Sequence, residues 1–296
     1  MKTLRKEDIS QEVFDLYDDY AHNRIDRRQF INKLSAYAVG GITVASLLGF
    51  IMPRYSETIQ LQPDDPRLES EYITYNSPKG GGEIKALLSR PAGTKEKLPG
   101  IIVVHENRGL NPHIEDVARR AALAGFVSLA PDALTPLGGY PGNDDDGKVK
   151  QKSLDQDKLF TDLLNSAIFL KGHELSNGKL GATGFCYGGG VVNNLAVKMG
   201  TDLNAGVPFY GRAPATDDVT KIQAPLMIQY AKDDPRVNAT RDEYRKALEN
   251  NKKDFVMYTY EGTRHGFHNN STPRYNEEQA KIAWERTISF FKKQLS

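Results

Sequence analysis

The sequence predicts an α/β fold in which a mostly parallel sheet is covered by helices on both faces. From residue 100 onward, short apolar segments alternate with amphipathic segments of roughly 10–15 residues, which is the pattern of repeated strand–helix units. Residues 100–105 read Gly-Ile-Ile-Val-Val-His, a nearly unbroken apolar run that is typical of a strand buried on both faces. With 296 residues, of which 39% are apolar and 26% charged, the chain can form a sizeable core.

Local patterns then define each element in turn. Residues 71–75 are rich in β-branched and aromatic residues and residues 83–88 nearly alternate; a glycine-rich turn separates them, so we expect a hairpin. The next helix, at 114–124, is expected to stop at Gly125. The remaining expected strands are 100–105, 126–130, 179–183, 205–210, 225–230 and 255–260. The remaining expected helices are 155–170, 188–199, 241–249 and 277–293.

Charge and cysteine content exclude several classes of protein. Lys plus Arg (39) nearly balance Asp plus Glu (38), for a net charge of +1, so we expect no nucleic-acid partner. The single cysteine excludes an intramolecular disulfide and a metal site built from several cysteines. The acidic, glycine-rich segment 138–147 lacks the residue spacing of an EF-hand, so it predicts a solvated loop rather than a calcium site.

The first 65 residues differ in pattern from residues 66–296, which we expect to form one domain. Arg27 and Arg28 precede a charge-free apolar run at 36–52, an arrangement that resembles a twin-arginine export signal. No clear cleavage site follows the run, so the prediction is either export to the periplasm or anchoring to a membrane by an uncleaved helix. The alternative is an amphipathic helix that docks on the domain of a cytoplasmic protein, with the arginine pair there by chance.

The lone cysteine lies in a motif that suits a nucleophile. Gly184-Phe-Cys186-Tyr-Gly188 falls between an expected strand and an expected helix, which is the context of the sharp nucleophile elbow of α/β-hydrolases. Glycines at both ends let the strand and the helix approach closely. The turn also places the sulfur at a helix N-terminus, where backbone N–H groups favour a thiolate. The alternative is a glycine-rich turn with a small buried cysteine.

A catalytic triad on this fold needs an acid and then a histidine, in that chain order after the nucleophile. The expected strand 225–230 is followed by two candidates for the acid, Asp233 and Asp234. The last expected strand is followed by His265, and Gly266 lets that loop turn inward. These three loops end at the same sheet edge, so we expect Cys186, His265 and one of the two aspartates to meet.

A third group of residues follows the first buried strand. Glu106 could accept the thiol proton or hold the cysteine until substrate arrives; alternatively it is a surface residue packed against Arg108. The backbone N–H groups of Asn107 and Tyr187 lie where α/β-hydrolases form the oxyanion hole.

Three motifs resemble those of the dienelactone hydrolase (carboxymethylenebutenolidase-like) family and, within it, the YghX-like branch. They are His-Glu-Asn-Arg-Gly-Leu-Asn at 105–111, Gly-Phe-Cys-Tyr-Gly-Gly at 184–189 and His-Gly-Phe-His-Asn at 265–269. The similarity runs over residues 70–296 and implies the α/β-hydrolase fold, a single domain that follows the N-terminal segment.

The resemblance also implies the roles of the site residues. The family's Cys-Asp-His triad carries over to Cys186, Asp234 and His265, because Ala231, Asp234 and Val237 match the family's register around the acid. The glutamate that partners the resting thiol corresponds to Glu106.

The sequence departs from the family where dienelactone-specific enzymes carry carboxylate-binding arginines. The corresponding segments read Pro-Asp-Ala-Leu at 131–134 and His-Asn-Asn at 268–270. Arg108, Arg212 and Arg264 are candidates to replace them.

The sequence therefore predicts a carboxylic ester hydrolase that cleaves a small ester or lactone through a cysteine nucleophile and a thioester intermediate. No cofactor or metal is expected. Three alternatives stay open at this point. They are a serine-esterase-like hydrolase of bulkier esters, a non-catalytic small-molecule-binding protein on the same fold, and a redox sensor that uses Cys186 alone.

Overall fold

A single twisted sheet organises residues 66–296. The computed structural model describes residues 4–296, and within that range its strands lie in the order β1-β2-β4-β3-β5-β6-β7-β8. β1 pairs antiparallel with β2, β2 pairs antiparallel with β4, and all the other neighbours are parallel. The strands are β1 (Leu68–Ser77), β2 (Gly82–Pro91), β3 (Leu98–Val104), β4 (Val127–Asp132), β5 (Ser176–Phe185), β6 (Ala205–Phe209), β7 (Leu226–Asp233) and β8 (Phe255–Arg264).

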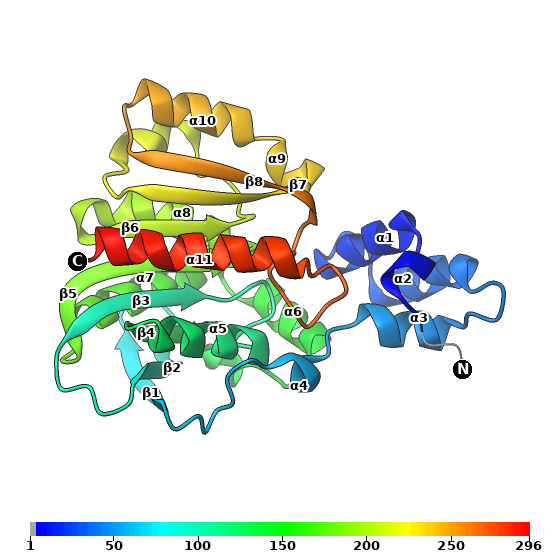
Figure 1. Cartoon of the computed structure of the whole chain (residues 1–296), viewed down its shortest axis with the longest axis horizontal. Helices are drawn as coiled ribbons and strands as arrows, with labels where there is room; N and C mark the ends of the chain where they lie inside the picture. Colours follow the sequence, from blue (N-terminus) through cyan, green and yellow to red (C-terminus); the bar gives the residue numbers. More distant parts are fainter. Residues whose placement is uncertain (1–3) are drawn as a thin grey trace.

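Helices cover both faces of this sheet, as Figure 1 shows. α5 (Pro112–Leu123) and α11 (Glu277–Gln294) pack on one face, and α7 (Gln156–Gly172), α8 (Tyr187–Met199) and α10 (Arg241–Asn250) pack on the other. The central strand β3 serves both cores, because Ile101 and Val103 point toward α5 and α11 whereas Ile102 and Val104 point toward α7 and α8. The apolar run at 100–105 is thus a strand buried on both faces, as the sequence predicted.

Each strand and helix expected after residue 66 has a counterpart, with ends that differ by a few residues, and the predicted α/β-hydrolase fold is confirmed. The acidic segment 138–147 is different, because its second half begins α6 (Asp144–Ser153). Asn143 caps this helix and three aspartates fill its first turn, which is where carboxylates are favoured. Asp144 is buried in an ion pair with Arg108 (2.7 Å), so the expectation of a solvated acidic loop was wrong there.

Short elements complete the described chain. They are α4 (Tyr55–Thr58), α9 (Pro235–Asn238) and 3₁₀ turns at Lys6–Asp8, Ser35–Tyr37, Thr135–Leu137, Gly200–Asp202 and Thr216–Lys221.

Residues 4–52 form a small helical unit, which we call the N-terminal module. α1 (Gln11–Ala21), α2 (Arg27–Leu34) and α3 (Val44–Ile51) enclose a core of their own, beside the carboxyl ends of the strands in Figure 1. Its buried side chains include Val13, Phe14, Tyr17, Tyr20, Phe30, Leu34, Leu47 and Ile51. The apolar run at 36–52 contains only the eight-residue helix α3, and Arg27 and Arg28 are exposed at the start of α2. Among residues 4–296, no helix is both long and apolar enough to cross a membrane.

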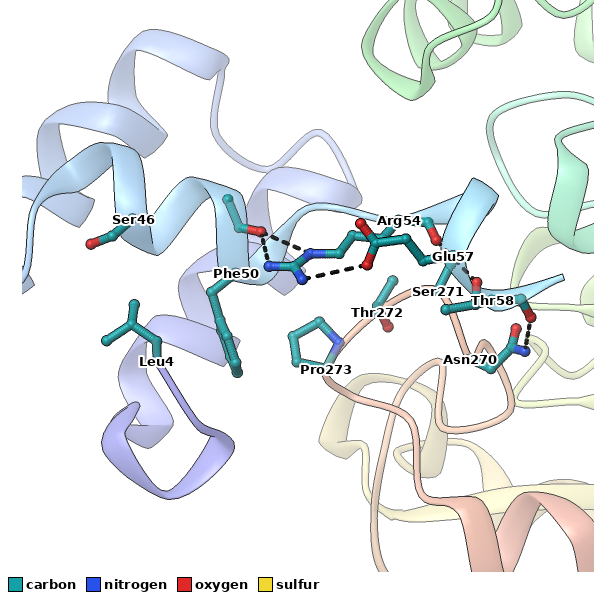
Figure 2. Close-up of a pocket in the computed structure, with 11 residues that line it drawn as sticks. Leu4, Ser46, Phe50, Arg54, Glu57, Thr58, Asn270, Ser271, Thr272 and Pro273 are labelled. Atoms are coloured by element: carbon teal, nitrogen blue, oxygen red, sulfur yellow. Dashed lines mark hydrogen bonds and ion pairs between the residues drawn. The ribbon is translucent and has the colours of Figure 1, made fainter. Parts of the chain in front are cut away.

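The segment after α3 fastens the module to the loop at 269–276. The Arg54 backbone N–H donates to the Ser271 carbonyl (2.8 Å), and Asn270 Nδ2 donates to the Thr58 carbonyl (2.6 Å). The Arg54 guanidinium also donates to the Gly49 carbonyl near the end of α3 (2.7 Å). Figure 2 shows Arg54 and Thr58 of this segment together with Asn270 and Ser271 of the loop. Because this loop follows His265, the module is tied directly to one wall of the candidate site.

Candidate active site

The three residues expected to form a triad meet at the carboxyl edge of the sheet. Cys186 follows β5, Asp234 follows β7 and His265 follows β8. His265 Nδ1 lies 2.5 Å from Asp234 Oδ2, in a buried ion pair. The structure also separates the two candidate acids, because Asp233 is exposed whereas Asp234 is buried and faces the histidine.

Cys186 adopts the strained backbone of a nucleophile elbow, with φ 56° and ψ −111°. The close contact of β5, α8 and β3 requires glycine at both flanks. A Cβ on Gly188 would lie 2.3 Å from the Val104 carbonyl oxygen, and a Cβ on Gly184 would lie 2.5 Å from the Gly188 carbonyl oxygen. The sharp turn leaves the sulfur partly exposed at the first turn of α8.

Charge stabilises the protonated form of the histidine. Burial alone would lower the pKa of His265, but the neighbouring Cys186 and Asp234 hold it above its ordinary value. Burial opposes the charged form of Asp234 as well, yet His265 and Arg236 keep the pKa of this carboxyl below its usual value. His265 is therefore held beside Cys186 as a histidine that binds a proton readily and is supported by a carboxylate.

A second histidine, His22 of the N-terminal module, lies in the same site. Its Nε2 lies 3.4 Å from Cys186 Sγ and 3.3 Å from His265 Nε2. Asp18, one turn earlier in α1, accepts from His22 Nδ1 through its carbonyl (2.8 Å) and lies near it through Oδ1 (3.2 Å). Sequence reasoning missed both residues; the only local signal was an Asp and a His four positions apart on one helix face.

Polar contacts hold the end of α1 in place over the site. Asn107 Nδ2 donates to the Ala21 carbonyl (2.8 Å), and Lys148 Nζ donates to the Tyr20 carbonyl (3.3 Å). The buried Arg274 guanidinium lies 3.5 Å from Asp18 Oδ1. The three contacts come from the loop after β3, from helix α6 and from the loop before α11, so His22 is positioned from several sides.

Glu106 is buried near the site but faces other groups. It accepts from Asn269 Nδ2 (3.3 Å). Burial would raise the pKa of Glu106, whereas Arg108, His113 and Arg274 together hold it below its ordinary value. Cys186 Sγ points toward His22 instead.

A cavity of about 690 Å³ opens beside the sulfur. Its lining includes Cys186, His22 and both residues proposed for the oxyanion hole, Asn107 and Tyr187. Of the arginines considered for substrate binding, Arg212 lines this cavity. The other two are engaged elsewhere: Arg108 is paired with Asp144, and Arg264 lies 3.5 Å from Asp15 of the module.

Comparison with known proteins assigns the chain to a family. The profile of the Dienelactone hydrolase family matches residues 84–295, a range that contains Cys186, Asp234 and His265. The chain belongs to the dienelactone hydrolase family. A "Putative carboxymethylenebutenolidase" of Saccharolobus solfataricus is 30% identical over 75% of this chain and 97% of its own length. The "Putative hydrolase fragment YghX" of Escherichia coli K12 is 51% identical over 38% of this chain and 97% of its own length.

Solved structures agree with this assignment. The crystal structure described as a "Putative Dienelactone Hydrolase" from Klebsiella pneumoniae aligns with a TM-score of 0.67 at 25% identity, over 76% of this chain and 99% of its own. A separate profile, YqhI-like, matches residues 1–39. Asp18 and His22 thus lie outside the dienelactone hydrolase match, although they contact its site.

The elbow geometry predicts that alanine destabilises the protein at one of two nearby glycines but not at the other. Gly188→Ala should destabilise the protein by about 1–3 kcal/mol, because the new methyl group would overlap the Val104 carbonyl. Gly190→Ala is the matched control, since the nearest atom to its Cβ would be Arg212 N at 3.5 Å. Urea denaturation measures both changes. Equal stability of the two variants would contradict the packing described here.

Proposed function

We propose that this dienelactone hydrolase family member cleaves small esters or lactones with Cys186 as nucleophile, Asp234 and His265 as its partners, and a thioester intermediate. The observation that carries the proposal is the buried Asp234–His265 pair beside a cysteine held in an elbow at the start of α8. The family assignment supports the ester or lactone class.

In this mechanism His265 takes the thiol proton, and the thiolate attacks the substrate carbonyl carbon. The backbone N–H groups of Asn107 and Tyr187 donate to the resulting oxyanion. The C–O bond of the ester then breaks, and the imidazolium returns its proton to the leaving alkoxide, which leaves an acyl thioester on Cys186. A water molecule, deprotonated by His265, attacks the thioester and releases the acid and the free thiol.

Glu106 has a supporting role in this proposal. Its carboxylate stays charged inside the domain, through Arg108 and Arg274, and so offers a second acceptor when Cys186 rotates away from His22. Among the described residues, Lys198, Arg212 and Arg236 line the cavity together with the acidic Asp157, and a further lining residue, Arg24, is paired with Asp18 and Asp19. This balance favours a substrate that itself carries a negative group.

Turnover of p-nitrophenyl acetate by the full chain tests the nucleophile. Cys186→Ala and His265→Ala should each abolish hydrolysis, and iodoacetamide should alkylate Cys186 faster than an ordinary thiol because its partner favours the thiolate. Full activity of Cys186→Ser would instead favour a serine-esterase-like hydrolase. Absence of turnover with a sluggish thiol would favour a binding protein, and reversible oxidation without turnover would favour a redox sensor.

The two adjacent aspartates provide a matched pair for the acid. Asp234→Asn should lower kcat by roughly 10²–10⁴-fold, whereas Asp233→Asn should leave it unchanged. Because Asp234 holds the pKa of His265 up and the mechanism uses the neutral imidazole as base, loss of Asp234 should also shift the acidic limb of the kcat/KM profile to lower pH. A pH profile that is identical in both variants would rule out Asp234 as the histidine's partner.

We also propose export of this protein by the twin-arginine route, on the basis of the exposed pair Arg27-Arg28 ahead of an apolar run. Replacing both with lysine should retain the protein in the cytoplasm of a bacterial host, as measured by fractionation and immunoblotting. Arg5→Lys is the control, since Arg5 is exposed and lies outside the pair. A wild-type chain that stays in the cytoplasm would contradict export, and the intact mass of exported protein shows whether His22 is retained.

A further inference from the structure

Three ligand-type atoms from distant parts of the chain converge at the elbow. They are His22 Nε2, Cys186 Sγ and His265 Nε2, and all three lie within 4.8 Å of one another. His22 belongs to the N-terminal module, whereas Cys186 and His265 belong to the hydrolase domain. Neither part therefore contains the whole set.

The hydrogen bonds around the two imidazoles leave both Nε2 atoms as acceptors. His22 Nδ1 faces the Asp18 carbonyl and carboxylate, and His265 Nδ1 faces the Asp234 carboxylate, so in each neutral ring the proton belongs on Nδ1. The two Nε2 lone pairs then face each other across 3.3 Å, with a sulfur 3.4 Å from one of them. Such a set of acceptors favours a shared donor or cation, and in this structure the Arg236 guanidinium reaches both Nε2 atoms.

We propose that His22, Cys186 and His265 form a site for a divalent transition metal, with Zn²⁺ the best match. Thiolate and imidazole are the ligands that zinc prefers, at about 2.3 Å and about 2.0–2.1 Å. Tetrahedral geometry with those lengths places two nitrogens about 3.3 Å apart and a nitrogen and sulfur about 3.6 Å apart. Two of the three observed separations, 3.3 Å and 3.4 Å, are close to these edges, and the third, between Cys186 Sγ and His265 Nε2, is within 4.8 Å.

The groups behind the ligands also match a metal site. A histidine that binds a metal commonly donates its other N–H to a carboxylate, which fixes the tautomer and makes the ring a stronger donor. His265 has such a partner in the Asp234 carboxylate, whereas His22 donates to the Asp18 carbonyl (2.8 Å) with the Asp18 carboxylate 3.2 Å from the same nitrogen. The cavity of about 690 Å³ beside Cys186 and His22 gives a fourth ligand, water or a small anion, access to the ion.

Arg236 competes for the same lone pairs. Its Nη2 lies 3.1 Å from His22 Nε2 and 3.4 Å from His265 Nε2, so a bound ion must displace a guanidinium. Arg236 is largely exposed and can move into solvent. Because Arg236 and the ion compete for the same nitrogens, removal of the arginine should lower the Kd for the metal.

Metal binding would oppose the proposed ester chemistry, since the ion would occupy both the nucleophile and the lone pair of its base. The binding itself does not depend on that chemistry. A spectroscopic measurement of metal binding can therefore confirm or contradict this proposal whether or not the protein hydrolyses esters.

Co²⁺ added to the reduced, chelator-treated full chain tests the site. We expect one ion per chain, a near-ultraviolet thiolate-to-cobalt charge-transfer band, visible bands of tetrahedral intensity and displacement by Zn²⁺. Cys186→Ser should remove the charge-transfer band. His22→Ala should weaken binding by more than the roughly 10–100-fold that loss of a second-shell partner costs.

Adjacent aspartates again provide the control. Asp18→Asn should weaken Co²⁺ binding roughly 10–100-fold, and Asp19→Asn, whose side chain pairs with Arg24 on the surface, should not. Arg236→Ala should lower the Kd. A titratable thiol with no charge-transfer band at saturating Co²⁺, or equal affinity in His22→Ala and the wild type, would overturn the proposal.

Discussion

The contact between the start of α8 and the end of β3 determines the geometry of the whole active centre. Gly188 lies so close to the Val104 carbonyl that no side chain fits between them. This contact forces Cys186 into its strained backbone conformation and brings the loop that carries Asn107 next to the sulfur. β7 and β8 are parallel strands of the same sheet, so the loops after them lie at the same edge as the elbow. This arrangement places Asp234 and His265 near Cys186.

The hydrolase domain could be predicted from the sequence because each of its elements is signalled by residues that are close together in the chain. Continuous apolar runs defined the buried strands, and the glycines around Cys186 defined the elbow. The choice of Asp234 over Asp233 needed the family resemblance, since the two are adjacent at the end of β7 and only burial distinguishes them. The α6 helix was missed because its aspartates were read as solvated, although Asp144 is neutralised by the buried Arg108.

The part that could not be predicted depends on docking between segments far apart in the chain. His22 is 164 residues from Cys186, and no motif around it signals a site. Its position depends on Asn107 and Arg274 in two loops and on Lys148 in α6, all of which contact α1. The module has its own apolar core and meets the domain near the site through hydrogen bonds and ion pairs. Such an interface between polar groups leaves no pattern in the sequence.

The position of His22 also bears on the timing of a reaction at Cys186. Water that attacks a thioester must stand between the acyl carbon and His265 Nε2, and this is the region that His22 Nε2 occupies. In the proposed mechanism the end of α1 would have to shift before water could reach the acyl group, and Asn107 and Arg274 are the contacts that would resist this shift. The motion of the module would then set how long an acylated Cys186 persists.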